Sequence, residues 1–576
     1  MKRKIISLLL SAELILCMLP VFGSAEEKPL KLTVTTDTHM QSYEAAGDLE
    51  PDPGEDLYTR GMLDRDIFYY ASQQGQLNYE STALMKQLLN DFAASDDEYM
   101  LIGGDLTNGA RSSHLQLASM LKETEEKTGK KIFVTCGNHD CSAKADETHI
   151  DVNEFKSIYA DFGFSEALCA HDSSASYTYD LSDGYRLLAI DSCIYGEDDG
   201  EINKSVFNWI KEQVAAAEKD GVKLIGMMHH SILPHFEVQP MIKNYMSRAE
   251  YLADAGVKLM FTGHIHANDI SSATTNKGNT IYDVQTGSLL TSPNAYRRVS
   301  ITDESIEIKS EYITSIDLSD LPAGYSDEQL NMIENDFAAY SYSFFEAGMC
   351  RWLNRYIGSA LKVGKTLKLK EGGAAFELLN ALMLKIGDAL LLPIYDNGEG
   401  DSIEGIANSV KCEIPESDYE MVYQVVAKVM NGFYHGDEPD SIKETEIPLL
   451  LDCVKVCLAH CISNMLYSGR AMSEFDSLIT ELTGTSPKIS KIKRLTKLNY
   501  AAAASCKIVE AVVEPLLSGL SCDFSAPYDI DVTIDGYYSS PVIKSDTPLS
   551  WLKRIALYFR HLFESLMRTV AVPYEK

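Results

Sequence analysis

The chain has 576 residues, a hydrophobic fraction of 45% and a formal net charge of −33. This length predicts more than one domain, and the hydrophobic fraction is sufficient for packed cores. So acidic a chain is a poor partner for nucleic-acid polymers or anionic membranes, because its overall field repels phosphate. Small phosphate esters remain candidate substrates wherever bound metal ions offset that repulsion.

The first 25 residues have the pattern of a secretory signal peptide. Lys2-Arg3-Lys4 is basic, residues 5–22 are mostly apolar, and Gly23-Ser24-Ala25 offers small residues for cleavage. Cleavage there predicts an extracytoplasmic protein, secreted or at the cell surface. Two alternatives stay open: retention of the segment as an anchor, and lipidation at Cys17, which the large Leu16 disfavours. No other stretch is long and apolar enough to predict a transmembrane segment.

Twelve cysteines are present, and eleven of them follow the predicted cleavage site. Their odd number leaves at least one unpaired in a mature monomer, and their spacing indicates no particular disulfide. Cys453, Cys457 and Cys461 recur every four residues, which on a helix forms a single apolar stripe. A metal cluster is the less favoured interpretation, because one continuous helix does not make its ligands converge.

Strand-like and helix-like segments alternate from Leu30 to about Thr314. The predicted strands are short apolar runs at 32–35, 99–102, 132–134, 186–190, 224–228 and 259–262. Helix-like stretches lie between them, one around Leu84 and Leu88 and another that ends at Gly129. Continuous apolar strands between helices predict an α/β fold with buried sheets, whose site lies beyond the carboxyl ends of the strands.

Helical periodicity dominates beyond about Asp317. The predicted helices are residues 376–391, 419–433, 447–467, 500–517 and 549–569. We therefore expect a signal peptide (1–25), an α/β domain (26–316) and a mostly helical C-terminal domain (317–576). The last predicted helix is amphipathic and basic, so it either packs on its domain or lies on a membrane surface. No chemistry is visible in this half, and an unidentified protein partner is one candidate role for it.

Five motifs with metal-ligating side chains follow predicted strands. They are Asp37-Thr38-His39, Gly104-Asp105, Gly137-Asn138-His139-Asp140, His229-His230 and Gly263-His264-Ile265-His266. A two-residue spacing in extended chain directs both side chains of a pair to one face. Mixed nitrogen and oxygen ligands suit Zn, Mn or Fe better than Ca. Each motif alone is weak evidence, but their order and placement together favour a site for two metal ions.

The five motifs resemble those of the calcineurin-like metallophosphoesterase superfamily, over about Leu30 to Thr314. That family has a four-layer α/β/β/α sandwich. The resemblance implies two metal ions, which are divalent or mixed-valence Mn, Fe or Zn. It implies that one ion is held by Asp37, His39 and His266 and the other by Asn138, His229 and His264. Asp105 would bridge the two ions. It also implies that a hydroxide shared by the metals attacks phosphorus and that His139, the catalytic acid, protonates the leaving oxygen.

Departures from other branches of the superfamily narrow this resemblance. Purple acid phosphatases place Tyr three residues after the bridging Asp, where this chain has Asn108. Phosphoprotein phosphatases place Asp-Arg directly after that Asp, where this chain has Leu106-Thr107. The complete ligand set is similar to that of the cyclic-nucleotide phosphodiesterase-like branch, and Ser113-His114 is similar to secreted bacterial members with a helical C-terminal domain.

One residue also departs from those bacterial members, which usually carry Pro before Gly137. This chain has Cys136 there, either a reactive thiol near the metals or, as we favour, a buried inert cysteine. Asp191, at another strand end, is expected to support the site or a turn rather than to bind metal.

Four further residues are candidate substrate contacts: Asn108, Arg111, His114 and His230. For the first three, capping or solvating the helix that follows is an equally good explanation. His230 either contacts substrate or bonds to nearby backbone, and an exchange of His229 for His230 as the ligand also stays open.

The sequence thus predicts a secreted, metal-dependent phosphoric ester hydrolase that acts on small, nucleotide-like phosphodiesters. A phosphomonoesterase is one alternative, because the same metals serve both reactions. The other alternative is a surface interaction protein with a secondary hydrolase activity.

Overall fold

The computed structural model describes most of the N-terminal half and parts of the C-terminal half. The described residues are 28–42, 44–45, 75–182, 184–236, 239, 241–357, 372–373, 391–396, 402–410, 412–439, 441–468, isolated positions from 502 to 518, and 529–538. The predicted signal peptide and the predicted helix 549–569 lie outside them. So do nearly all of residues 376–391 and 500–517.

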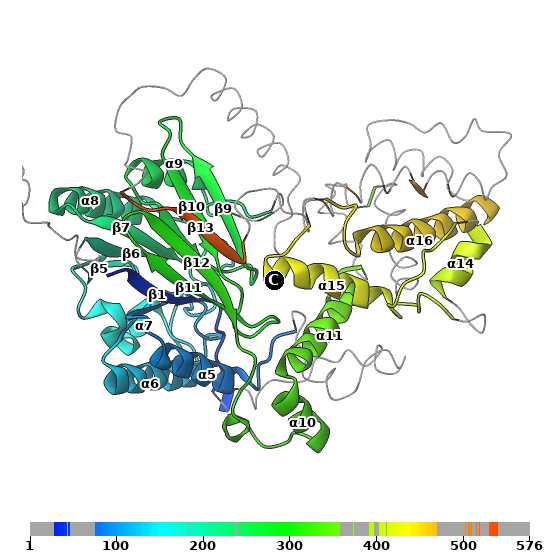
Figure 1. The fold of residues 1–576 in the computed structure, drawn as a ribbon, viewed down its shortest axis with the longest axis horizontal. Coiled ribbons are helices and arrows are strands. Elements are labelled where there is room, and N and C mark those ends of the chain that lie inside the picture. Colours follow the sequence, from blue (N-terminus) through cyan, green and yellow to red (C-terminus); the bar gives the residue numbers. More distant parts are fainter. Residues whose placement is uncertain are drawn as a thin grey trace, which may run out of the picture.

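Two mixed β-sheets form the centre of the N-terminal half (Figure 1). The first sheet has the order β13-β12-β11-β1-β2-β3, with β1 at Leu30–Thr35, β2 at Tyr99–Ile102, β3 at Lys131–Val134, β11 at Ala295–Ile301, β12 at Ser305–Tyr312 and β13 at Asp531–Asp535. The second has the order β4-β5-β6-β7-β8-β10-β9, with β4 at Cys169–Ala170, β5 at Tyr177–Ser182, β6 at Tyr185–Ile190, β7 at Lys223–Met228, β8 at Leu259–Thr262, β9 at Asp269–Thr274 and β10 at Thr280–Gln285.

Parallel pairing brings the carboxyl ends of the central strands to one edge of each sheet. In the first sheet β1, β2 and β3 are parallel, with Leu32 opposite Tyr99 and Tyr99 opposite Lys131. In the second sheet β6, β7, β8 and β10 are parallel. The loops that carry the five motifs leave these strands at the same edge, as the sequence predicts.

Alternating side chains divide the apolar residues between two layers of core. On β2, Leu101 faces the second sheet, whereas Met100 and Ile102 face helices on the outer side. This period of two explains why the strand is a continuous apolar run, since both of its faces are buried.

Helices cover the outer faces of both sheets (Figure 1). Three cover the first sheet: α5 (Ser81–Ala94), α6 (Arg111–Thr128) and α7 (Val152–Ile158). Two cover the second sheet: α8 (Lys204–Asp220) and α9 (Tyr245–Asp254). Helix α6 ends at Thr128 and is capped by Gly129, where the sequence predicts the end of a helix; the φ of Gly129 is 72°, a left-handed cap. The four-layer α/β/β/α arrangement is confirmed.

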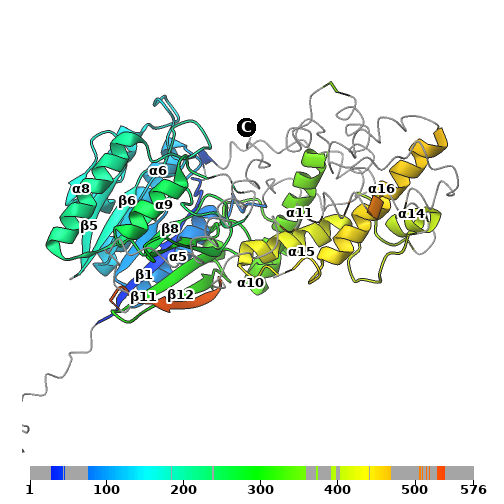
Figure 2. The same ribbon diagram turned by 90° about the horizontal axis from the view of Figure 1, so that it is seen from above.

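The C-terminal half is mostly helical where it is described, and it extends to one side of the sandwich (Figure 2). Its main helices are α10 (Asp327–Asn335), α11 (Phe337–Ile357), α14 (Ile403–Val410), α15 (Val422–His435) and α16 (Ile447–Ser468). Helices α15 and α16 match the predicted helices 419–433 and 447–467 closely. Cys453, Cys457 and Cys461 are buried on α16, as expected of an apolar stripe.

Strand β13 lies within the C-terminal domain (317–576), which the sequence predicts to be mostly helical. It pairs antiparallel to β12, with Val532 opposite Ile308 and Ile534 opposite Ile306. Lys258 Nζ donates to the carbonyl oxygens of Asp535 (2.6 Å) and Gly536 (2.8 Å). The chain therefore returns from the helices to complete the first sheet. A five-residue edge strand shows too little periodicity to be seen among long helical segments.

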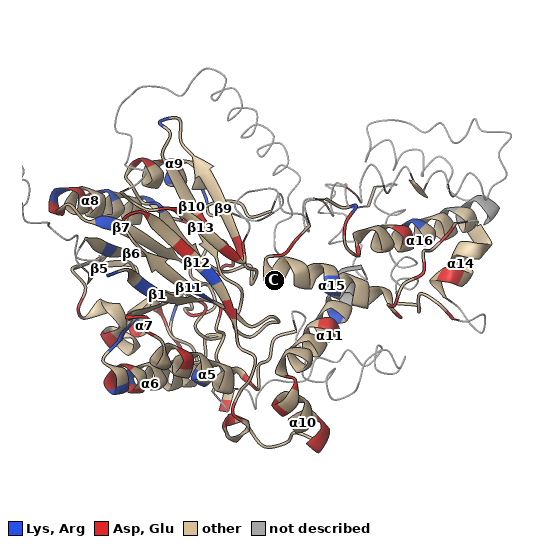
Figure 3. Ribbon diagram, in the orientation of Figure 1, with Lys and Arg blue, Asp and Glu red and all other residues tan. Residues whose placement is uncertain are grey.

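Charged residues occur on helices, strands and loops alike (Figure 3). Helix α10 carries Asp327, Glu328 and Glu334 but no Lys or Arg. Among the helices that the structure describes, none combines the length and the hydropathy needed to cross a membrane.

Candidate metal centre

The seven predicted metal ligands converge where the two sheets meet. Asp37 and His39 follow β1, Asp105 follows β2 and Asn138 follows β3. His229 follows β7, and His264 and His266 follow β8. Each sheet therefore contributes one side of a single cluster.

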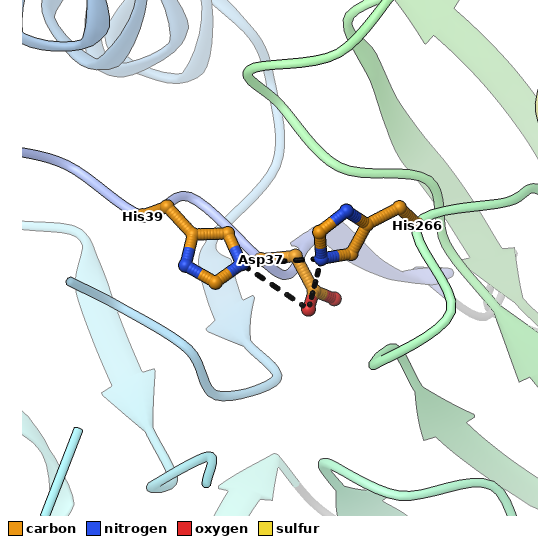
Figure 4. Close-up of side chains that lie close together, drawn as sticks. All are labelled: Asp37, His39 and His266. Atoms are coloured by element: carbon orange, nitrogen blue, oxygen red, sulfur yellow. Dashed lines mark hydrogen bonds and ion pairs between the residues drawn. The ribbon is translucent and has the colours of Figure 1, made fainter. Parts of the chain in front are cut away.

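Asp37, His39 and His266 form the first ligand group (Figure 4). His266 Nε2 lies 3.1 Å from His39 Nε2 and 3.3 Å from Asp37 Oδ1. Ligand atoms bound about 2.1 Å from one ion lie about 3.0–3.4 Å apart in octahedral or tetrahedral geometry. The third separation, from His39 Nε2 to Asp37 Oδ1, is 3.9 Å. The three side chains are thus arranged as candidate ligands of one cation.

A second group surrounds Asn138. Its Oδ1 lies 3.0 Å from His229 Nε2 and 3.1 Å from His264 Nδ1. Asp105 Oδ2 lies 3.3 Å from His229 Nε2 and 3.7 Å from His39 Nε2. One carboxylate oxygen therefore faces both groups, which is the placement a bridging ligand needs.

The hydrogen bonds of Asp37 show that its donor set fits a cation. Asp37 Oδ2 accepts from Thr36 Oγ1 (2.8 Å) and from the backbone N–H of His264 (2.9 Å). Asp37 Oδ1 is buried and has no hydrogen-bond partner. Buried polar atoms are nearly always satisfied, so an oxygen left free among imidazole nitrogens fits a metal-ligand role.

Two histidines are oriented by partners outside the ligand groups. His39 Nδ1 lies 2.8 Å from Asn108 Oδ1, and His229 Nδ1 lies 3.1 Å from the carbonyl oxygen of Gly103. In both cases Nδ1–H donates to the oxygen, which leaves the Nε2 lone pair directed at the cluster.

Charge coupling inside the cluster favours cation binding. Burial lowers the pKa of His39 to about 4 and that of His264 to about 3, so both rings are neutral, as a ligand must be. Burial opposes the charge on His229, but Asp105 and Asp37 raise its pKa to about 10. A proton on His229 would balance the buried carboxylates when no cation is bound, and a bound cation would displace that proton and take its place at Nε2.

The carboxylates are correspondingly held ionised. Burial raises the pKa of Asp105, but the charges of His229 and His139 bring it well below its usual value. The pKa of Asp37 is also lowered, because His229 and His266 outweigh the effect of burial.

The backbone is strained at five of the seven candidate ligands. Their φ angles are positive: Asp37 (49°), His39 (35°), Asp105 (47°), His264 (76°) and His266 (67°). Residues with a Cβ rarely adopt this region, and such outliers concentrate at functional sites. The surrounding hydrogen bonds must offset this strain, which indicates that the ligand positions are defined by the fold.

Two motif glycines allow the loops to approach each other closely. A Cβ on Gly137 would lie 2.1 Å from Asp105 Oδ1, and one on Gly263 would lie 2.2 Å from Asp37 Oδ2. Any larger residue at either position would displace a candidate ligand, which explains why both motifs contain glycine there.

His139, the predicted acid, lies at the exposed side of the cluster. Its ring is edge-on to that of His39, with centroids 5.2 Å apart. Its backbone N–H donates to Asp105 Oδ1 over 2.8 Å. The ring therefore lies beside His39 of the first ligand group without being a candidate ligand itself.

Asp140 is a supporting residue to which sequence reasoning assigned no role. It is buried, and its carboxylate accepts the backbone N–H groups of Leu106 (3.1 Å), Thr107 (3.0 Å) and Gly137 (2.8 Å). The first two bonds join the loop that carries Asp105 to the loop that carries Asn138, and the third stabilises the latter loop. Its place in the Gly-Asn-His-Asp motif is the signal that could have identified it.

The structure gives two of the predicted substrate contacts partners on α6 and its surroundings. Arg111 pairs with Glu154 (2.6 Å) and donates to the carbonyl oxygen of His149 (3.1 Å). His114 is buried, with Nε2 2.9 Å from Thr107 Oγ1. These bonds indicate that both residues support the fold.

The other two predicted contacts lie nearer the cluster. Asn108 is exposed and orients His39 as described above. His230 is buried, with Nδ1 2.9 Å from Ser192 Oγ and Nε2 3.2 Å from the carbonyl oxygen of Asp198. The partners of both His230 nitrogens lie outside the ligand groups, whereas His229 Nε2 lies near Asn138 and Asp105. The geometry therefore favours His229 over His230 as the candidate ligand.

Comparison with known proteins agrees with this geometry. Residues 30–268 match the family model described as calcineurin-like phosphoesterase. This part of the chain is a calcineurin-like phosphoesterase domain. A probable cyclic nucleotide phosphodiesterase of Rhodococcus erythropolis is 24% identical over 201 residues, which is 34% of this chain and 60% of that protein. A cAMP/cGMP dual specificity phosphodiesterase of Mycobacterium tuberculosis is 23% identical over 186 residues, or 32% and 52% of the two chains.

Two solved structures resemble the domain at low sequence identity. A dimetal phosphatase from Danio rerio has 10% identity and a TM-score of 0.36, covering 50% of this chain and 97% of that one. A purple acid phosphatase from yellow lupin has 12% identity and a TM-score of 0.32, covering 50% and 52%. The chain covers only 60% and 52% of the lengths of the two sequence relatives. The family model ends at residue 268, so it does not match the C-terminal helices.

Proposed function

We propose that this protein is a dinuclear-metal phosphodiesterase that hydrolyses small, nucleotide-like phosphodiesters. The observation that carries the proposal is Asp105 Oδ2, which faces two separate groups of nitrogen and oxygen ligands at 3.3 and 3.7 Å. Two adjacent cations suit an in-line displacement at phosphorus. The names of the sequence relatives support a phosphodiester as the substrate class.

The candidate ligands fit two cations as the resemblance implies. Asp37, His39 and His266 would hold one, Asn138, His229 and His264 the other, with Asp105 between them. When bound, such ions lower the pKa of water and neutralise negative charge on phosphoryl oxygens. The net charge of −33 makes this neutralisation necessary for an anionic substrate to bind.

The chain's own residues orient the groups around that centre. Asn108 fixes the tautomer of His39, and Asp105 Oδ1 fixes the backbone of His139. The exposed ring of His139 is placed to donate a proton to a leaving oxygen at the edge of the site. We assign His139 the role of general acid.

We further propose that the protein acts outside the cytoplasm. The basic, apolar and small-residue segments of residues 1–25 support export. Expression in a bacterial host followed by N-terminal sequencing tests this, with a mature chain beginning at Glu26 as the expected result. A protein that stays cytoplasmic with Met1 intact would contradict it.

The activity is tested with bis-p-nitrophenyl phosphate, p-nitrophenyl phosphate and cyclic nucleotides as substrates. We expect Mn, Fe or Zn to support diester hydrolysis, and chelation to abolish it. Asp105→Ala should lose both metals and at least about a thousandfold in kcat/KM, because it removes the ligand shared by the two groups. His139→Ala should keep its metals and lose turnover, about a hundredfold or more.

Each outcome separates one interpretation from another. Faster hydrolysis of the monoester than of the diester would favour a phosphomonoesterase. Turnover that survives complete metal removal, or an Asp105→Ala protein with normal metal content, would refute the dinuclear proposal.

A further inference from the structure

A second cluster of candidate metal ligands, which includes two thiols, lies next to the loop that carries Asn138. Cys136, Asp191 and Cys193 each direct one ligand atom at the others, all within 4.8 Å. Cys136 follows β3 and Cys193 follows β6, so the cluster joins the two sheets. Cys136 and Asp191 are buried, and Cys193 is partly buried.

The separations in this cluster match the edges of a tetrahedral metal site. Cys136 Sγ lies 3.8 Å from Cys193 Sγ and 3.5 Å from Asp191 Oδ1. Bonds of about 2.3 Å to sulfur and about 2.0 Å to oxygen place tetrahedral ligands about 3.8 Å (S–S) and about 3.5 Å (S–O) apart around zinc. Both observed distances agree with these values.

The carboxylate of Asp191 is fixed in place. It accepts the backbone N–H groups of Ala175 and Cys193, both at 2.9 Å, and the hydroxyl of Tyr195. The two sulfur atoms of Cys136 and Cys193 are soft ligands, which select zinc-like cations over the harder ions.

We propose that Cys136, Cys193 and Asp191 form a third metal site that binds a thiophilic divalent cation of the zinc class. The two thiols would release their protons to solvent as the cation binds. The site is separate from the dinuclear centre, whose candidate ligands contain no sulfur. It also extends the sequence interpretation, in which Cys136 was an inert buried cysteine and Asp191 a support.

The position of this site gives it a structural consequence. Cys136 directly precedes the segment 137–140, which carries Asn138 and His139. A cation shared by Cys136 and Cys193 would fix the start of that segment to the end of β6. Metal ions held by protein ligands stabilise folds in this way.

The experiment uses Co²⁺ as a spectroscopic probe of the full chain, freshly reduced and kept free of oxygen. Cobalt bound to thiolates gives a charge-transfer absorption band that nitrogen and oxygen ligands do not produce. We expect this band in the wild-type protein and equally in Asp105→Ala. It should disappear in Cys136→Ser and in Cys193→Ser, and bound zinc should fall by one equivalent per chain in both.

Cys169→Ser is the matched control, because Cys169 lies on β4 outside the cluster and is only partly buried. Its band should equal that of the wild type. A protein with no thiolate band, or a band unaffected by Cys136→Ser and Cys193→Ser, overturns the proposal. So does a native disulfide between Cys136 and Cys193, if the reduced protein takes up no metal there.

A second measurement covers the case in which the serine variants do not fold. Zinc X-ray absorption of Asp105→Ala loaded with one zinc equivalent should show sulfur neighbours at about 2.3 Å. A spectrum with only nitrogen and oxygen neighbours overturns the proposal, whatever the fate of the variants.

Discussion

The two sides of the candidate metal centre are supported in different ways. On the first sheet, the ligand loops bind each other: the backbone N–H of Asp37 donates to Gly104 O (3.0 Å) and that of His39 to Asp105 O (2.9 Å). Asp140 adds two more bonds between neighbouring loops and one within its own loop. These hydrogen bonds between ligand loops all lie within the calcineurin-like domain, although β13 completes the first sheet from beyond it.

On the second sheet, the loop that carries His264 and His266 packs against the C-terminal half. The backbone N–H of Asn268 donates to the carbonyl oxygen of Tyr434, 3.2 Å away at the end of α15. Ala267 is buried against Phe345 of α11 and Phe433 of α15. One side of the site therefore depends on residues beyond the family domain.

This difference gives the helical half a physical role beside any partner it binds. The helical half supports His264 and His266 through its contacts with Ala267 and Asn268, which directly follow His266. A domain excised at residue 316 would keep all its ligands but lose the support of His264 and His266. The predictions below test each side in turn.

The largest effect is expected at Asp140 on the first side. Asp140→Ala leaves three buried backbone N–H groups without an acceptor, which costs about 3–5 kcal/mol of unfolding free energy. Chemical denaturation measures this, and metal content should fall with it. Exposed Asp161 provides the control, since Asp161→Ala should cost less than about 0.5 kcal/mol. Equal stability of Asp140→Ala and wild type would contradict the role assigned to Asp140.

On the second side, a buried charged histidine predicts a loss of stability at high pH. His235 lies 3.1 Å from Asp269 and 3.4 Å from Asp283. Burial opposes its charge, but the two carboxylates raise its pKa to about 10. The folded protein therefore holds a proton that an unfolded histidine releases near pH 6.5.

The sign follows from that proton. The contribution of this proton to the free energy of unfolding is complete below about pH 6.5 and is lost as pH rises through about 10. Between these two values the free energy of unfolding falls by about 1.4 kcal/mol per pH unit. Denaturation of metal-loaded wild type and His235→Gln from pH 6 to 10 measures it. Groups common to both proteins cancel in the difference, which should shrink as pH rises. A difference that is constant with pH would show that His235 is neutral in the fold.

Much of the first side could be predicted from sequence because its signals are local. Each of its motifs directly follows a short apolar run, and strand ends place such motifs at one edge. Gly129 likewise marks the end of α6 as a left-handed cap. The ligand groups came from motif resemblance, and the structure brings the same seven side chains together.

What sequence could not supply depends on contacts between distant segments. Tyr434 supports Asn268 across 166 positions of sequence, and β13 pairs with β12 across a long helical insertion. Nor could spacing reveal that His114 and Arg111 are engaged inside the fold. Neither has a local pattern that separates a structural bond from a substrate contact.

A smaller effect is expected from Asn108, which orients a ligand of the first side. Asn108→Ala removes the acceptor for His39 Nδ1 and should weaken metal binding about 10- to 100-fold. Competition with a metal-sensitive fluorescent chelator gives the affinity. Asn108→Asp keeps an acceptor oxygen and should restore most of the loss. If both variants bind metal like the wild type, His39 does not need this partner.

The smallest effect is expected at the contact between the helical half and the ligand loop. Gly436 caps α15 with a φ of 86°, and a Cβ there would lie 2.9 Å from Asn268 O. Gly129 has a similar φ of 72°, but a Cβ there would meet nothing within 4 Å. Alanine at either position costs about 1 kcal/mol in backbone strain. Only Gly436→Ala adds a steric clash, so we expect about 2 kcal/mol in total.

The comparison of these two variants isolates the contact from the strain. Because Asn268 follows His266 by two residues, a displaced Asn268 should weaken metal binding a few-fold in Gly436→Ala and not at all in Gly129→Ala. Denaturation and metal titration of both proteins measure the two quantities. Equal metal affinities would mean that the loop of His264 and His266 holds its geometry without α15. The second side of the centre would then be as self-contained as the first, and the helical half would need another role.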